Sequence, residues 1–300
     1  MMRWFLALAL LASALRADSP ALILADMAAE LAALQGAKGT ATAVLEKPDI
    51  RPHRAHGKLP MDYVQNLVLT SNQTKYRLRY WMNIATAAAE AGTAIEGSTG
   101  LGMDQPNTAN WYSNNFFEFA YGGKEILKSS MARLTVVESG GERAVVTLTW
   151  DTPEAAVTLE VALAAGADAL ELRCRVAAKG EPQPVRLGFR AYPGHMPPHH
   201  ARRAVTCQRE LLPETEVELA APETTLVLFD EAEPHLPCAI RFAEAGQRTA
   251  RLSLQSYGVT VFLEYAAAAE WVSGPIQVWD FRNASLNETL DRLLVPAGGR

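Results

Sequence analysis

Residues 147–176 read TLTWDTPEAAVTLEVALAAGADALELRCRV, and apolar and polar side chains alternate along three successive runs of this stretch. The runs are residues 147–150, 156–163 and 169–176. In the last run Leu, Leu, Cys and Val share one face, whereas Glu, Arg and Arg share the other. A period of two with one polar face is typical of antiparallel strands that cover a core on one side. The stretch therefore predicts three consecutive antiparallel strands.

The same alternation continues over most of the chain, with glycine-containing turns between the runs. We expect about fifteen strands in an all-β fold, including one at Lys124–Ser129. Two stacked antiparallel sheets, a large β-sandwich or supersandwich, accommodate so many strands in one body. Short helices are expected at residues 22–34 and after Ser285, where Ser285-Leu286-Asn287-Glu288 forms a capping-box pattern.

Composition limits the class of protein and its partners. The 300 residues are 49% hydrophobic and 20% charged, with a net charge of −5, which indicates a globular chain rather than a disordered or fibrous one. A mildly acidic chain without runs of Lys and Arg offers no concentrated positive face for nucleic acid. No Pro-, Gly- or Ser-rich linker divides the chain, so we expect one domain over residues 18–300. Two smaller sandwiches, separated near residues 195–205, are the alternative.

The N-terminus has the order of a secretory signal peptide. Met1–Arg3 is a positive region, Trp4–Leu11 is apolar, and small residues allow cleavage after Ala14 or Ala17. About ten apolar residues are too few to span a bilayer. We therefore expect residues 1–17 to be removed and the mature chain to be secreted or periplasmic, without a membrane span. An uncleaved N-terminal anchor is the alternative.

Three cysteines are too few for a disulfide framework. Cys174 alternates with leucines and valine, so we expect it to lie in the core. Cys207 and Cys238 could pair in an oxidising compartment, but their separation in space cannot be read from sequence.

The longest stretch without strand alternation is residues 92–115. Near its end Trp111 and Tyr112 lie beside Asn114 and Asn115. Aromatic rings can cover the apolar face of a sugar while amides bind its hydroxyl groups, so these four residues are candidates for ligand binding. The alternatives are that Trp111 closes one end of the sandwich, or that the segment is disordered.

Three of the six histidines, His195, His199 and His200, lie within six residues. His195 and His199 have the spacing of a helical metal site, but prolines at 197 and 198 forbid the helix. We predict no metal and no cofactor. The histidines are candidates for acid–base catalysis, since imidazole titrates near neutral pH, or they lie on a solvated loop. The acidic run Asp230–Pro237 is expected to be solvated as well.

Residues 116–196 resemble the galactose mutarotase-like β-supersandwich superfamily, which includes the aldose 1-epimerases. The resemblance lies in the successive runs VTLTW, VTLEVAL and LELRCRV, followed by a proline-containing turn and another strand. It implies a supersandwich fold and a carbohydrate ligand. The epimerases carry a His, an aromatic residue and an Asn on the strand after the long pair. Here that strand carries Arg190 and Tyr192, which become candidates for ligand binding.

Three functional hypotheses follow from these patterns. The first is an exported β-sandwich protein that binds a carbohydrate. The second is a carbohydrate-active enzyme, epimerase-like or polysaccharide lyase-like, that uses histidine acid–base chemistry. The third is a non-catalytic interaction protein of the cell envelope. No nucleophile-elbow, zincin or nucleotide-binding motif occurs in a suitable context.

Overall fold

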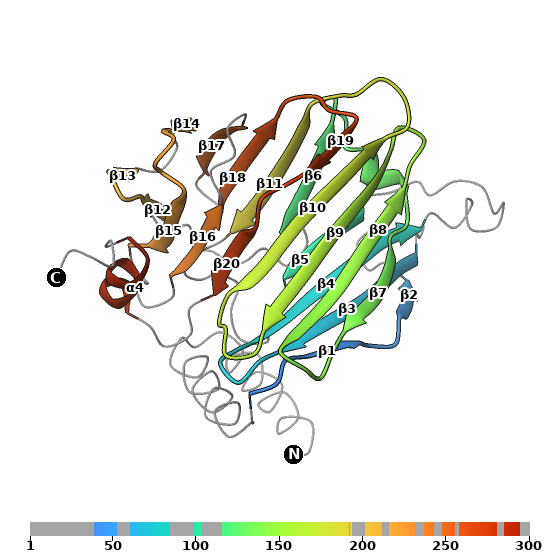
Figure 1. Ribbon diagram of the computed structural model, residues 1–300, viewed down its shortest axis with the longest axis horizontal. Helices are drawn as coiled ribbons and strands as arrows, with labels where there is room; N and C mark the ends of the chain where they lie inside the picture. Colours follow the sequence, from blue (N-terminus) through green and yellow to red (C-terminus); the bar gives the residue numbers. More distant parts are fainter. Residues whose placement is uncertain are drawn as a thin grey trace, which may run out of the picture.

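The computed structural model describes residues 39–52, 61–84, 99–103, 116–191, 193, 202–211, 216–231, 237–242, 248–255, 258–280 and 285–294. These residues form twenty strands in two ten-stranded sheets, and every strand pair is antiparallel. The sheets stack face to face (Figure 1). The predicted all-β antiparallel sandwich is therefore confirmed.

The first sheet has the strand order β1-β3-β4-β5-β6-β11-β18-β17-β14, and β2 pairs with β3. Its strands are β1 (Thr42–Leu45), β2 (Asp49–Pro52), β3 (Met61–Thr70), β4 (Lys75–Ile84), β5 (Thr99–Met103), β6 (Phe117–Tyr121), β11 (Val185–Ala191), β14 (Glu216–Leu219), β17 (Arg248–Gln255) and β18 (Gly258–Tyr265).

The second sheet has the order β13-β12-β15-β16-β20-β10-β9-β8-β7, and β19 pairs with β10. Its strands are β7 (Arg133–Glu138), β8 (Arg143–Asp151), β9 (Ala155–Ala164), β10 (Leu170–Ala178), β12 (Arg202–Val205), β13 (Glu210–Leu211), β15 (Thr225–Asp230), β16 (Cys238–Phe242), β19 (Glu270–Val272) and β20 (Ile276–Asp280). The three strands predicted from residues 147–176 are β8, β9 and β10, which are neighbours in this sheet.

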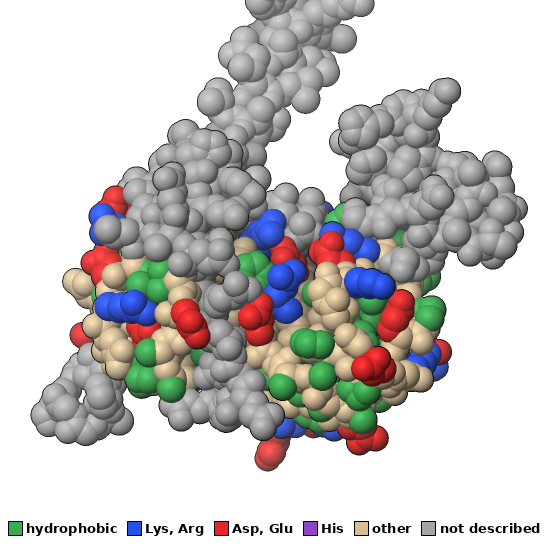
Figure 2. Space-filling view, turned by 90° about the horizontal axis from the view of Figure 1, so that it is seen from above, with side chains coloured by type: hydrophobic (Ala, Val, Ile, Leu, Met, Phe, Trp, Pro, Cys, Tyr) green, Lys and Arg blue, Asp and Glu red, His purple; other side chains and the backbone are tan. Residues whose placement is uncertain are grey.

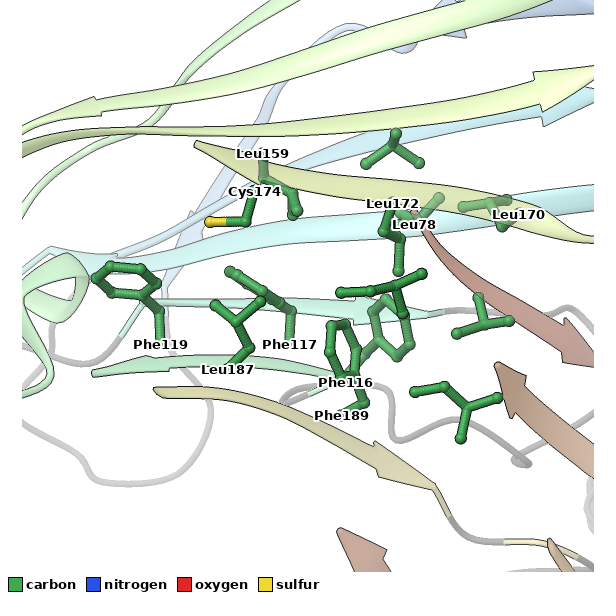
Figure 3. Close-up of a cluster of buried hydrophobic side chains, with 14 of the residues drawn as sticks. Leu78, Phe116, Phe117, Phe119, Leu159, Leu170, Leu172, Cys174, Leu187 and Phe189 are labelled. Atoms are coloured by element: carbon green, nitrogen blue, oxygen red, sulfur yellow. The ribbon is translucent and has the colours of Figure 1, made fainter. Parts of the chain in front are cut away.

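The core lies between the sheets. Alternate residues of both sheets point inward and form one continuous apolar cluster. In Figure 3, aromatic side chains from β6 and β11 meet leucines of the opposite sheet. The Phe189 ring centroid lies 5.9 Å from that of Phe116 and 5.8 Å from that of Phe117. Cys174 is fully buried in this cluster, as predicted, and burial raises the pKa of its thiol.

The C-terminal helix α4 (Leu286–Leu293) begins with the predicted capping box. The Ser285 hydroxyl accepts a hydrogen bond from the Glu288 N–H at 3.2 Å, and a Glu288 carboxylate oxygen accepts one from the Ser285 N–H at 2.8 Å. The helix packs Leu293 against Trp279 on the outward face of the second sheet. Among the described residues, no helix combines the length and apolar character that crossing a membrane requires.

Some sequence expectations differ from the structure. Lys124–Ser129 is not a strand, because residues Ile126–Ser129 form a single 3₁₀ turn. The stretch 92–115 contains a strand, β5, although its sequence shows no strand alternation. Glycines at 100 and 102 conceal the alternation of β5, since they contribute no side chain to its outward face. The predicted helix at residues 22–34 and the predicted signal peptide lie outside the described residues.

One long side of the sandwich is closed by neutral hydrogen bonds between β1 and the β7–β8 turn. The Ala41 N–H donates to the Gly141 carbonyl at 2.8 Å, and the Gly140 N–H donates to the Ala41 carbonyl at 2.8 Å. Gly140 has φ +88°, a conformation that favours glycine. The Ser139 hydroxyl accepts a hydrogen bond from the Ala43 N–H at 2.8 Å.

The other long side is closed by an ionic clamp around Glu223, whose side chain is fully buried. Its carboxylate accepts two hydrogen bonds from Arg209, both at 2.9 Å, one from the Thr206 hydroxyl at 2.7 Å and one from the Ala220 N–H at 2.8 Å. Arg209 also donates to the Glu218 carbonyl of β14 at 3.0 Å. The clamp thus links the β12–β13 turn of the second sheet to the edge strand of the first.

Candidate functional site

A row of residues crosses five neighbouring strands on the outward face of the first sheet. Trp81 of β4 pairs in register with Gly100 of β5, and Glu118 of β6 pairs with Gly188 of β11, which pairs with Phe262 of β18. Since Leu101 lies opposite Phe117, Gly100 lies opposite Glu118. Two of the five positions lack a side chain. The row therefore presents Glu118 between two glycines, with an aromatic residue at each end.

Glu118 is held by Arg190, the one predicted ligand-binding residue that the structure describes. A Glu118 carboxylate oxygen lies 2.6 Å from the Arg190 guanidinium, which also donates to the Thr260 hydroxyl at 3.3 Å. The two charged side chains are 24% and 23% exposed, so each keeps a solvent-facing edge. Carboxylates and guanidinium groups have more hydrogen-bonding positions than this pair uses, so both can also bind a ligand.

Gly188 allows its neighbours to approach closely. A Cβ atom at this position would lie 3.1 Å from the Glu118 Cβ and 3.2 Å from Cε1 of the Phe262 ring. On the same strand, the Arg186 guanidinium lies over the Phe262 ring, 5.2 Å from its centroid. Phe262 therefore packs beside the glycine and supports a cation, as expected for a cation–π contact.

Beyond the partly exposed Trp81, which lies opposite Val64, the same outward face of β3 and β4 carries polar side chains two or more residues further along the strands. Glu46 accepts hydrogen bonds from the Asn66 amide at 2.7 Å and from Arg77 at 3.1 Å. The hydrogen bond from Asn66 has the largest effect on the pKa of Glu46 and, together with Arg77, outweighs burial and lowers it. Glu46 is therefore ionised at neutral pH. The face combines an indole, paired charges and amide donors, which suits a polar ligand with an apolar side.

The remaining predicted site residues lie outside the described residues. They are Trp111, Tyr112, Asn114, Asn115, Tyr192, His195, His199 and His200. Their roles stay predictions. The described residues contain no group of three or more His, Cys, Asp or Glu side chains placed to hold a metal ion.

Sequence reasoning missed Trp81, Glu118, Arg186 and Phe262. One sequence signal could have identified Arg186. The pattern Arg-x-Gly-x-Arg on β11 places two arginines on the same face of a strand, on either side of a glycine. The row itself joins residues 81 to 262, and only strand order and register bring them together.

A second polar group lies between the sheets, at one end of the second sheet. Arg202, Asp230, Cys238 and Asp280 are all buried. Asp230 was expected in a solvated run, but it continues the inward-facing series of β15 and is fully buried. Burial and the nearby Asp280 raise the pKa of the Cys238 thiol. The positive charge of Arg202 offsets part of this rise. Cys207 is exposed and, like Cys238, is a free thiol, so these two cysteines do not form a disulfide.

A cleft of about 420 Å³ lies at the turns that follow β6, β8 and β10. Its lining includes Lys124, Glu154 and Glu181 and does not include the residues of the row. Seen from above the sandwich, positive and negative side chains are interspersed, and neither sign forms one continuous patch on the described part of that face (Figure 2).

No protein-family model matches the chain, and no curated protein matches it in sequence. Among solved structures, it is similar to a TPR-domain containing protein from Parabacteroides distasonis, with 8% identity and a TM-score of 0.46 over 88% of this chain and 58% of that one. It is also similar to the GH36 α-galactosidase AgaA from Geobacillus stearothermophilus, with 11% identity and a TM-score of 0.42 over 81% and 41% of the two chains.

A proposed aldose 1-epimerase from Escherichia coli K12 has 9% identity and a TM-score of 0.36, over 77% of this chain and 98% of that one. By contrast, this chain spans only about two fifths of the length of the α-galactosidase chain.

Proposed function

We propose that this chain is an exported β-supersandwich protein of the galactose mutarotase-like kind, and that it binds a carbohydrate on the outward face of its first sheet. One observation carries the proposal: Trp81, Glu118 and Phe262 lie in one row across the sheet, with glycines on both sides of Glu118. The resemblance of residues 116–196 to that superfamily is in keeping with the ligand class.

The physical argument is one of complementarity. Sugars present apolar C–H faces and a rim of hydroxyl groups. An indole can cover the former, while a carboxylate accepts hydrogen bonds from hydroxyl groups and a guanidinium donates them. Neighbouring strands lie about 4.8 Å apart. Trp81 on β4 and Gly188 on β11 are three strand spacings apart, so about 14 Å separates their backbones. That length accommodates more than one pyranose ring.

The experiment is calorimetric titration of the chain from Asp18 onward against a panel of mono-, oligo- and polysaccharides. We expect Trp81→Ala to weaken binding about five- to tenfold, because a lost stacking contact costs on the order of 1–1.5 kcal/mol. Thr149→Ala, on the outward face of the second sheet, is the control and should bind as the parent does. Equal loss in both variants, or binding unaffected by Trp81→Ala, would place the ligand elsewhere.

Export is part of the proposal and has its own measurement. Expression of the full chain in a secreting host should yield a mature N-terminus at Leu15 or Asp18, determined by mass spectrometry. A mature protein that retains Met1 would contradict the signal peptide and favour the uncleaved anchor. The hypotheses of a histidine-dependent enzyme and of an envelope interaction protein remain alternatives to carbohydrate binding.

A further inference from the structure

Arg186 is an exposed cation on the candidate binding face. Glu264 of β18 lies opposite it in register, but within the described part of the chain no ion pair joins Arg186 to a carboxylate. Its one described contact is the Phe262 ring, 5.2 Å from the guanidinium carbon to the ring centroid. Two other arginines of this face differ, because Arg190 pairs with Glu118 and Arg77 pairs with Glu46. An unpaired guanidinium beside a binding row is therefore open to an anionic group of a ligand.

The position of Arg186 is set by its strand and by the aromatic ring that its guanidinium lies over. Strand β11 holds its backbone in the middle of the sheet, between β6 and β18. The Phe262 ring is itself held beside Gly188, where a side chain would collide with it. A guanidinium stacked on an aromatic ring keeps its in-plane N–H donors free, and these donors match the two oxygens of a carboxylate.

The negative charge of Glu118 does not oppose this arrangement, because Arg190 lies 2.6 Å from it. On β11, Arg186 and Arg190 flank Gly188 on the same outward face, two residues to either side. Of these two cations, Arg190 is engaged with the protein's own carboxylate and Arg186 is not.

We infer that the ligand is an acidic carbohydrate, and that Arg186 binds its carboxylate while Trp81, Glu118 and Arg190 contact the sugar rings. The inference rests on the proposed carbohydrate binding and adds the class of sugar. A uronic acid unit supplies the required chemistry, a pyranose ring with a carboxylate attached. Arg186 is then the residue that determines specificity for acidic over neutral sugars.

The test compares oligogalacturonides and alginate oligosaccharides with their carboxyl-reduced counterparts, which keep the ring skeleton and lose the charge. We expect the parent protein to bind at least one acidic form about tenfold or more tightly than its reduced form, as one charge-assisted contact allows. Arg186→Met should abolish this preference, so that the acidic and the reduced forms bind with similar affinity. Raising the ionic strength should weaken binding of the acidic form only.

Arg175→Met is the matched control, because Arg175 is an exposed strand arginine on the outward face of β10 for which no ion pair is described. It should retain the preference, and thermal unfolding of both variants should resemble that of the parent. Equal binding of acidic and reduced sugars, or a preference that survives Arg186→Met, would overturn the inference but leave carbohydrate binding intact. Binding of sulfated sugars alone would overturn the carboxylate assignment. Failure to bind any sugar would overturn the proposed function as well.

Discussion

The two sheets are built alike, yet their outward faces differ. The first sheet presents Trp81, Phe262 and a half-buried ion pair, 23–24% exposed. On the second sheet the outward-facing Trp279 is covered by helix α4. The rest of that face presents small hydroxyl side chains, such as Thr149 opposite Thr158, and the more exposed pair Arg173–Glu171, 41% and 30% exposed. Both faces alternate with a buried series, so the backbone pattern is the same. The two faces therefore differ in the size and pairing of their outward side chains.

The largest expected effect on stability comes from breaking the clamp around Glu223, because this clamp holds the edges of the two sheets together. Glu223→Gln replaces a fully buried carboxylate that four hydrogen bonds satisfy, and leaves Arg209 without its charge partner. We expect a loss of about 3 kcal/mol in the free energy of unfolding, measured by urea denaturation. Glu210→Gln breaks an exposed pair with Arg203 and should cost less than about 0.5 kcal/mol. Similar losses in both variants would contradict the clamp.

Acid should weaken the same clamp in the unmodified protein. Burial alone would raise the pKa of Glu223, but hydrogen bonds from Arg209, Thr206 and the Ala220 N–H outweigh it and lower the pKa to about 2 from an ordinary 4.5. Because the folded-state pKa is the lower one, the stabilisation is present above pH 4.5 and is lost as the pH falls toward 2. Denaturation curves across this range should show a loss of about 2–3 kcal/mol that Glu223→Gln lacks.

A double-mutant cycle would sharpen the comparison of the two faces directly. We expect Glu118→Ala and Arg190→Ala to show a coupling energy of about 1–2 kcal/mol, because the pair is half-buried and in hydrogen-bond contact. The cycle for Glu171 and Arg173 should give less than about 0.5 kcal/mol. Equal couplings would mean that the outward faces differ in composition but not in energetics.

The smallest effect concerns the glycine beside Glu118. A methyl group at Gly188 would lie 3.1 Å from the rigid Glu118 Cβ and 3.2 Å from the Phe262 ring, so we expect Gly188→Ala to cost about 1 kcal/mol. A Cβ at Gly180 meets nothing within 4 Å, and Gly180→Ala should be neutral or slightly stabilising. Thermal unfolding of the two variants compares them. If Gly188→Ala stabilised the protein instead, the close packing of Glu118 and Phe262 around Gly188 would be contradicted.

Local alternation predicted the sandwich because most strands, such as β9 and β10, show their buried face in their own sequence. Strand β5 was missed because Gly100 and Gly102 carry no side chain, and residues Lys124–Ser129 mimic a strand although they form a turn. The candidate site was predicted only at Arg190. Glu118 and Trp81 could not be joined to it, since their proximity depends on the pairing of β4, β5, β6 and β11. Buried Asp230 could not be foreseen either, because a carboxylate in an acidic run is usually solvated.

Strand β7 is an outer strand of its sheet, and its register shifts between Val136 and Glu138. Val137 within it is 61% exposed. A straight, apolar outer strand would offer its unpaired backbone groups to another chain as a template for aggregation. The irregularity twists this strand and interrupts the regular spacing of those groups. Together with the hydrogen bonds between the β7–β8 turn and the start of β1, this irregularity makes the edge a poor template for a further copy of the chain.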